Sequence, residues 1–166
     1  MPAPPSAGEG FPTGAGILFG LGLGGFFDGI VFHQLLQWHH MLTSAGYPPD
    51  SVPNLRINTL WDGIFHASTY LCVAAGLLVL WRAARRTHVH WPAHALMSTM
   101  LIGFGIFNLV EGIVDHHVLG LHHVNETVPR QQWIWWDLAF LAWGAAMLIG
   151  GMLMLRNGRR GGNALP

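Results

Sequence analysis

The sequence contains no lysine, a single cysteine and few charged residues of either sign. All eight basic residues are arginine, the formal net charge is 0, and charged residues make up 10% of the chain, against about 25% in an average globular domain. Such a composition excludes a basic nucleic-acid-binding face, so we expect no nucleic-acid partner. The lone Cys72 excludes an intramolecular disulfide.

Long apolar runs take the place of the missing charge. Hydrophobic residues make up 51% of the chain, and crossing a hydrocarbon core takes about 20 residues. We place four spans at 14–38, 56–82, 93–118 and 131–155. Backbone exposed to lipid must satisfy its own hydrogen bonds, so these spans are helices. The sequence therefore predicts an all-α, multi-pass protein whose main partner is the lipid bilayer.

Arginine residues predict how the spans are oriented. They follow the second and the fourth span: Arg82, Arg85, Arg86, Arg156, Arg159 and Arg160. The positive-inside rule therefore predicts that both termini are cytoplasmic. No basic residue precedes the first span, so it lacks the features of a cleaved signal and we expect it to be retained. We expect a disordered segment over residues 1–13 and a cytoplasmic tail over 157–166.

One polar segment occurs twice. Residues 28–40 align without a gap on residues 111–123, and seven of the thirteen positions are identical, where chance gives roughly one or two; we interpret this as a tandem duplication. The identical pairs are Gly29/Gly112, Ile30/Ile113, Val31/Val114, His33/His116, Leu36/Leu119, His39/His122 and His40/His123. The duplicated unit is a carboxylate (Asp28 or Glu111) followed by histidines.

The duplication extends to the next helix of each half. Trp61-Asp62 opens the second span, and Trp136-Asp137 opens the fourth. The transmembrane domain, residues 14–156, then consists of two tandem two-helix repeats at about 14–86 and 93–156. Two spans per repeat preserve orientation, so we expect a four-helix bundle with a pseudo-twofold axis along the membrane normal.

The spans hold acids that no arginine or lysine inside them neutralises. A charge at the bilayer centre costs several kcal/mol, so these acids need protons, imidazolium or a metal cation. We expect the acids of the four spans in one layer in the outer half of the bilayer, with His33, Asp115 and His116 one turn above. His39, His40, His122 and His123 should lie near the outer surface.

These residues form our candidate metal ligands, because acids and histidines recur on facing helices. The set is Asp28, His33, His39, His40, Asp62, His66, Glu111, Asp115, His116, His122, His123 and Asp137. Carboxylate and imidazole ligands suit transition metals, with iron or copper favoured and zinc next. The Glu-x-x-His spacing of di-iron bundles is missing. Protonated acids and histidines that cap helix ends are the structural alternative.

Three functions fit such a site. The first is a redox enzyme, an oxidase or hydroxylase that acts on a lipophilic or periplasmic substrate. The second is metal handling, either transport or metal loading at the periplasmic face. The third is a zinc hydrolase of lipid headgroups, in which zinc-bound water attacks. Haem between His33 and His116 ranks lowest because acids would flank it. Whether the protein is an enzyme stays open, as does a homo-oligomer.

Four strings carry a family resemblance: GGFFDGIVFHQLLQWHHM, LWDGIFHA, NLVEGIVDHHVLGLHHVNE and WWDLAFL. They resemble a family of bacterial predicted membrane proteins catalogued as a domain of unknown function. The resemblance covers about residues 14–156. It implies a four-span protein of the bacterial inner membrane, and it implies no activity.

Overall fold

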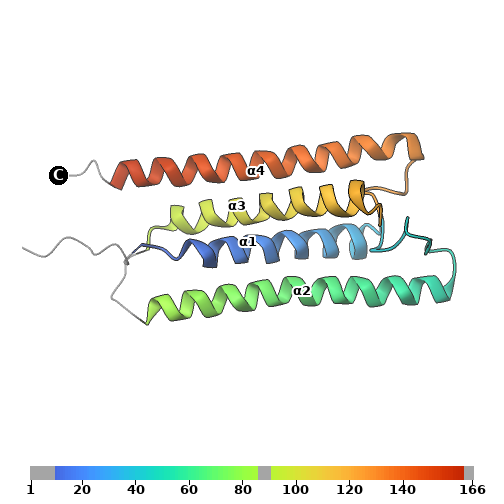
Figure 1. The fold of residues 1–166 in the computed structure, drawn as a ribbon, viewed down its shortest axis with the longest axis horizontal. Helices are drawn as coiled ribbons and strands as arrows, with labels where there is room; N and C mark the ends of the chain where they lie inside the picture. The colour runs from blue at the N-terminus through green and yellow to red at the C-terminus, as the bar shows by residue number, and fades with distance from the viewer. Residues whose placement is uncertain (1–9, 86–90, 163–166) are drawn as a thin grey trace, which may run out of the picture.

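Four helices run the length of the molecule (Figure 1). The computed structural model describes residues 10–85 and 91–162, and the predicted N-terminal segment and C-terminal tail lie partly outside these residues. The helices are α1 (Thr13–Phe27), α2 (Val52–Ala84), α3 (Ala93–Glu111) and α4 (Trp133–Gly162). All four are long and apolar enough to cross a membrane, once α1 and α3 are counted with the helical segments that continue them.

Local sequence explains where the helices begin. Pro12 and Pro92, both in extended conformation, precede α1 and α3. The Ser51 hydroxyl accepts a hydrogen bond from the Asn54 amide at the start of α2, where a proline occupies the first turn. Proline fits a helix start because the first amides need no intrahelical acceptor.

The helices are ordered α2, α1, α3, α4 across the molecule. The packed pairs are α1 with α2, α1 with α3, and α3 with α4. Two glycines bring the central pair together, because a Cβ on Gly103 would lie 2.9 Å from the Gly20 Cα atom. Small residues at such a crossing are typical of membrane helices, where close backbone approach drives packing.

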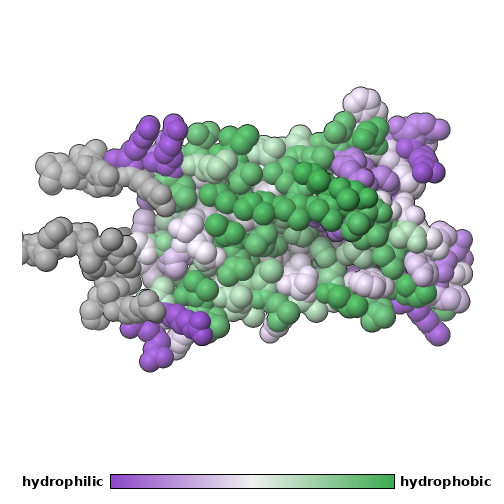
Figure 2. All heavy atoms as spheres, in the orientation of Figure 1, coloured by the Kyte–Doolittle hydropathy of each residue, from purple (hydrophilic) through white to green (hydrophobic). Residues whose placement is uncertain are grey.

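Apolar side chains form a band around the middle of the molecule, and polar groups gather at both ends (Figure 2). Arg82 and Arg156 mark one end, which we call the arginine end; the chain enters α1 and leaves α4 there. The opposite end carries residues 28–51 and 111–133, and we call it the histidine end. The membrane orientation of these ends stays a prediction.

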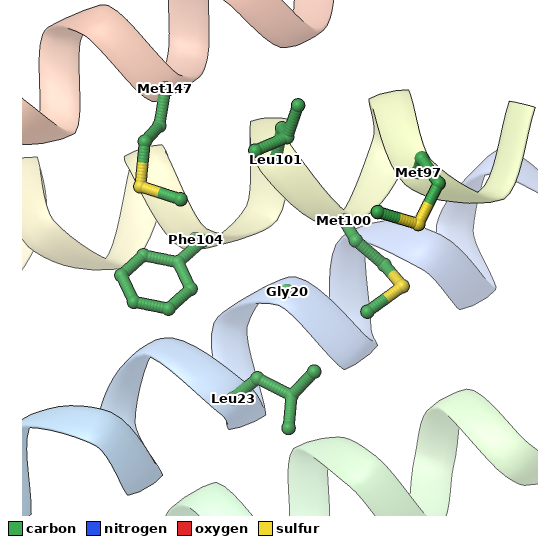
Figure 3. A pocket seen from close by; sticks show the side chains of 7 residues that line it. All are labelled: Gly20, Leu23, Met97, Met100, Leu101, Phe104 and Met147. Atoms are coloured by element: carbon green, nitrogen blue, oxygen red, sulfur yellow. The ribbon is translucent and has the colours of Figure 1, made fainter. Parts of the chain in front are cut away.

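A small groove lies between α1, α3 and α4, away from the histidine end. Its volume is about 120 Å³, and apolar side chains including Met97, Met100, Phe104 and Met147 line it (Figure 3). None of the candidate histidine and carboxylate ligands lines this groove.

The two central helices end in an unusual way. Helix α1 continues as a π-helical segment (Asp28–Leu35), and α3 continues as a second one (Gly112–Val118). The predicted spans reach residues 38 and 118, and both continuations are helical, but as π-helix rather than α-helix. π-Helical turns are rare and often occur at functional sites. Both segments carry residues of the duplicated motif.

A left-handed residue then reverses the chain after each π-helical segment. Gln37 has φ 51° and Gly120 has φ 58°. Hydrogen bonds of 2.9 Å from Trp38 N–H to Phe32 O and of 2.8 Å from Leu121 N–H to Asp115 O close the two turns, as at many helix C-termini. The following residues therefore return toward the bundle.

Equivalent positions in the two halves make equivalent contacts, of which these reversals are one example. The internal duplication and its pseudo-twofold axis nevertheless stay predictions, whereas the all-helical, four-span architecture is confirmed.

Candidate metal centre

Four histidines converge inside the histidine end. His33 and His116 come from the π-helical segments, and His39 and His122 come from the loops that follow the reversals. All four are buried, with at most 2% of each residue exposed. His39 and His122 were expected near the outer surface; that expectation is wrong, because the chain reversals carry both residues back into the bundle.

In the first half, His33 lies between two carboxylates. Its Nδ1 atom is 2.9 Å from Asp62 Oδ1, and its Nε2 atom is 3.2 Å from Asp28 Oδ2. The ring stacks on Phe65 with 5.7 Å between centroids. The contact with Asp28 is short but not aligned as a hydrogen bond.

The second half repeats this arrangement. The Nδ1 atom of His116 is 3.3 Å from Asp137 Oδ1, and its Nε2 atom is 3.0 Å from Glu111 Oε1. Phe140 lies beside the ring at 5.6 Å. Neither contact of His116 is aligned as a hydrogen bond.

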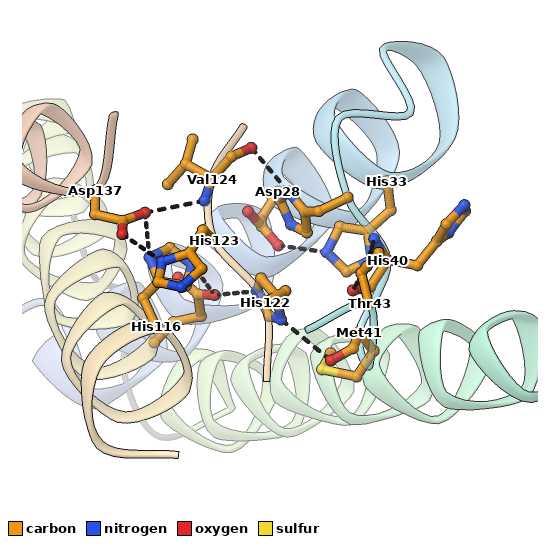
Figure 4. Close-up of polar contacts among 12 residues, drawn as sticks. Asp28, His33, His40, Met41, Thr43, His116, His122, His123, Val124 and Asp137 are labelled. Carbon is orange, nitrogen blue, oxygen red and sulfur yellow. Dashed lines mark hydrogen bonds and ion pairs between the residues drawn. The ribbon is translucent and has the colours of Figure 1, made fainter. Parts of the chain in front are cut away.

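Asp62 and Asp137 each hold the loop that follows the histidine segment. Asp62 accepts hydrogen bonds from the Met41 amide (2.9 Å) and pairs with His40 Nδ1 (2.8 Å). Asp137 accepts from the Val124 amide (3.0 Å) and pairs with His123 Nδ1 (2.6 Å), as Figure 4 shows. Each ion pair among the described residues joins a histidine to one of these acids or to Asp28 or Glu111.

The loop histidines are fixed by carbonyl groups of the opposite half. His39 Nδ1 lies 2.8 Å from Val124 O, and His122 Nδ1 lies 3.2 Å from Met41 O (Figure 4). A carbonyl oxygen only accepts hydrogen bonds, so each Nδ1 carries the proton and donates it. In a neutral ring, Nε2 then presents a lone pair.

Several of these lone pairs and carboxylate oxygens face one another. Glu111 Oε1 lies 2.9 Å from His122 Nε2 and 3.0 Å from His116 Nε2. Unpartnered buried atoms around the same centre include His33 Nε2, His39 Nε2, Asp28 Oδ2 and Glu111 Oε2. Buried acceptors without donors cost free energy, and a proton or a metal cation placed among them would offset that cost.

Two groups of three residues have ligand atoms within 4.8 Å of one another, close enough to hold a metal ion. One group is His33, His39 and His122, and the other is Glu111, His116 and His122. Ligating histidines typically donate their second N–H to a carboxylate or a carbonyl. His33, His39 and His122 hydrogen-bond such an acceptor through Nδ1, and His116 Nδ1 lies 3.3 Å from Asp137 Oδ1 without that alignment. These groups could hold a metal.

Burial lowers the pKa of His39 well below its usual value, and the neighbouring His122 and His33 lower it further. Its imidazole is therefore neutral near pH 7. Neutral imidazole is the form that binds metal ions.

The structure brings together most of the predicted ligands. Asp28, His33, His39, Glu111, His116 and His122 form the centre, which we call the inner cluster. Asp62, His40, Asp137 and His123 surround it. His66 and Asp115 belong to neither donor group: His66 Nδ1 donates to the Asp62 carbonyl of its own helix (2.8 Å), and Asp115 is half-buried.

Sequence reasoning missed the groups that orient the histidines. The carbonyls of Met41 and Val124 could not be predicted from the pattern of side chains, because every residue has a carbonyl. Phe65 and Phe140 were detectable, since each follows a predicted ligand, Asp62 or Asp137, by three positions. Three positions is one helical turn, which puts them on the same face.

The fold and the site define a multi-pass membrane protein with a buried histidine and carboxylate cluster that could hold a metal. The chain belongs to the family described as predicted membrane protein (DUF2243), which it matches over residues 15–158. No curated protein and no solved structure matches the chain.

Proposed function

We propose that this protein is a membrane metalloprotein whose inner cluster binds a transition metal ion and carries out redox chemistry with dioxygen. The proposal includes the predicted setting: the bacterial inner membrane, both termini in the cytoplasm and the cluster in the outer half of the bilayer. Iron or copper is the favoured metal; zinc is the next, and because zinc has no redox chemistry it would go with the hydrolase instead.

One observation carries the metal proposal. His122 donates its Nδ1–H to Met41 O (3.2 Å), and its Nε2 lies 2.9 Å from Glu111 Oε1. In the neutral imidazole both of these atoms are acceptors, which repel each other unless a proton or a metal cation lies with them. A metal ion held by His122 and Glu111 would remove this repulsion and would use the lone pair that the Nδ1 hydrogen bond leaves on Nε2.

The donor set supports iron or copper. Its ligands are imidazole nitrogens and carboxylate oxygens, which suit these ions. Each three-residue group offers fewer donors than the metal takes, so a coordination position is left for an external ligand.

Burial of the cluster favours dioxygen as that ligand. The four histidines lie almost fully inside the protein, among the rings of Phe32, Phe65 and Phe140. Dioxygen is small and apolar, whereas a lipid headgroup is too large and polar for such a site. Reduction of one dioxygen to two waters takes four electrons and four protons, which a lipophilic or periplasmic reductant would supply.

Transport across the membrane is less favoured. Between the inner cluster and the arginine end, the buried polar residues of the described chain are Thr69, Ser98, Thr99 and Asn108. None of them is ionisable, and Thr69, Ser98 and Thr99 donate to carbonyls of their own helices. A metal ion leaving the cluster in that direction would find few ligands.

Metal loading is the second candidate, because one observation favours it. The side chains of His40 and His123 are 17% and 24% exposed, and each contacts an acid beside the inner cluster. These two histidines offer a route by which ions reach the centre from the histidine end.

Elemental analysis of the detergent-purified protein, with its optical spectrum and its oxygen uptake in the presence of a quinol, tests the proposal. Stoichiometric iron or copper and oxygen uptake support it. Iron or copper without oxygen uptake would favour metal loading, and stoichiometric zinc would favour a hydrolase.

Matched variants locate the metal. His116→Ala should lose metal, whereas His117→Ala should keep it, because His117 is the exposed neighbour on the same π-helical segment. A protein that contains no metal and takes up none on reconstitution would contradict the proposal.

A further inference from the structure

We infer that the inner cluster binds two metal ions, and that each half of the chain holds a histidine ligand of the other half in place. This inference rests on the proposed function, since it concerns the same centre. It adds the number of ions and the coupling between them.

The donor groups come as two overlapping sets. His33, His39 and His122 form one set, Glu111, His116 and His122 form the other, and Asp28 lies 3.2 Å from His33 in the first. The combined cluster offers four imidazole nitrogens and two carboxylates. One ion with six ligands would leave no position open, whereas two ions would each have one carboxylate and open positions.

Charge balance points to the same number. Four buried acids, Asp28, Asp62, Glu111 and Asp137, lie in or directly around the cluster. Every ion pair that the structure records for them involves a histidine. Buried charge in a membrane protein needs a partner. One divalent ion carries half the charge of four carboxylates, and two divalent ions carry the same charge as all four.

Two chains of hydrogen bonds cross between the halves. Asp62 accepts from the Met41 amide (2.9 Å), and the Met41 carbonyl accepts from His122 Nδ1–H (3.2 Å). Asp137 accepts from the Val124 amide (3.0 Å), and the Val124 carbonyl accepts from His39 Nδ1–H (2.8 Å). An acid of each half therefore orients a loop histidine of the other half.

This crossing makes the two ions interdependent. An ion in the first set would hold His39 and, through it, the carbonyl of Val124, a residue whose amide is held by Asp137 beside the second set. An ion in the second set acts on Met41 and Asp62 in the same way through His122. Binding of one ion thus orders ligands of the other, which is positive cooperativity.

Titration of the metal-free, full-length protein in detergent with Cu²⁺, and separately with Fe²⁺ under anaerobic conditions, counts the ions. We expect two ions per chain, bound cooperatively, and a spin-coupled pair in electron paramagnetic resonance. Asp28→Asn and Glu111→Gln should each leave one uncoupled ion. One ion per chain in the unmodified protein would overturn this inference and leave the proposed function intact; no bound ion would overturn both.

The hydrogen-bond chain from Asp62 through Met41 to His122 is tested in the Asp28→Asn background. In that background the remaining ion is expected to lie with Glu111, His116 and His122. Asp62 contacts none of these three residues directly. Adding Asp62→Ala should weaken binding of this ion about tenfold, the lower range for groups that support metal ligands. Adding Asp62→Asn should largely preserve binding, because an amide oxygen still accepts from the Met41 amide.

If the Asp62→Ala and Asp62→Asn variants bound the remaining ion with equal affinity, the proposed coupling through these hydrogen bonds would be overturned. The mirror experiment, Asp137→Ala and Asp137→Asn in the Glu111→Gln background, follows the second chain through Val124 and His39. Circular dichroism and gel filtration select the variants that keep the fold, and the two experiments give independent readings should one variant fail to fold.

Discussion

The imidazole rings of His39 and His122 lie parallel to one another, with 4.4 Å between their centroids and 5° between their planes. The two residues are 83 positions apart and occupy equivalent places in the duplicated motif. Each ring is held through Nδ1 by the other half. Stacking of this kind forms only if both loops fold back together, so the two loops behave as one structural unit.

Replacing single histidines should reveal the shared position of His122. His122→Ala should cause the larger loss of metal, because His122 belongs to both donor groups, whereas His39 belongs to one. His39→Ala should therefore retain more metal than His122→Ala, and the exposed His117→Ala should retain the full amount. Elemental analysis of the three purified variants measures this order. Equal loss in His39→Ala and His117→Ala would mean that His39 is not a ligand.

The spans and much of the site were predictable from the sequence, because both depend on properties of short segments of the chain. Hydrophobic length set the helices, and the cost of burying acids singled out Asp28, Asp62, Glu111 and Asp137, all of which are buried at the histidine end. Acids in the membrane must find partners, so their convergence follows from energetics rather than from any remote feature of the chain.

The inward position of His39 and His122 was not predictable in the same way. It depends on π-helical geometry and on a left-handed residue after each segment, and Gln37 gives no sign of such a conformation. Gly120 was the available signal, since glycine often ends a helix. His66 shares a helical stripe with Asp62, but it lies one turn nearer the arginine end and its Nδ1 donates to its own helix, so its role as a ligand stays a prediction.

Close approach of α1 and α3 should make Gly103 sensitive to one methyl group. A Cβ at Gly103 would lie 2.1 Å from the Ile17 carbonyl oxygen, and backbone atoms cannot rotate away. We expect Gly103→Ala to lower the free energy of unfolding by about 1–3 kcal/mol, as overpacking typically does. Gly150→Ala is the control, because nothing lies within 4 Å of its Cβ position. Unfolding in detergent by a chemical denaturant compares the two, and equal stability would contradict the observed crossing.

The reversal at Gly120 should resist a branched side chain. Its φ of 58° is left-handed and the space around it is open, so the penalty of Gly120→Val comes from the backbone, about 1–2 kcal/mol. Because this turn carries His122 into the cluster, metal content should fall as well.

The equivalent turn supplies a control of opposite sign. Gln37 has a left-handed backbone conformation although it carries a side chain, and glycine adopts that conformation without strain. Gln37→Gly should therefore leave stability and metal content unchanged or higher. A Gly120→Val variant as stable and as metal-rich as Gln37→Gly would show that neither turn constrains the loop histidines.

Removing the metal should destabilise the fold in proportion to its affinity. A ligand that binds only the folded state at about a hundred times its Kd adds about 2.7 kcal/mol of stability. Chelation of the purified protein should therefore lower its thermal unfolding temperature, and adding the ion back should restore it. His117→Ala should show the same response. His122→Ala should respond less to both treatments, because it lacks the residue common to both donor groups; a full response in this variant would place the bound ion outside the inner cluster.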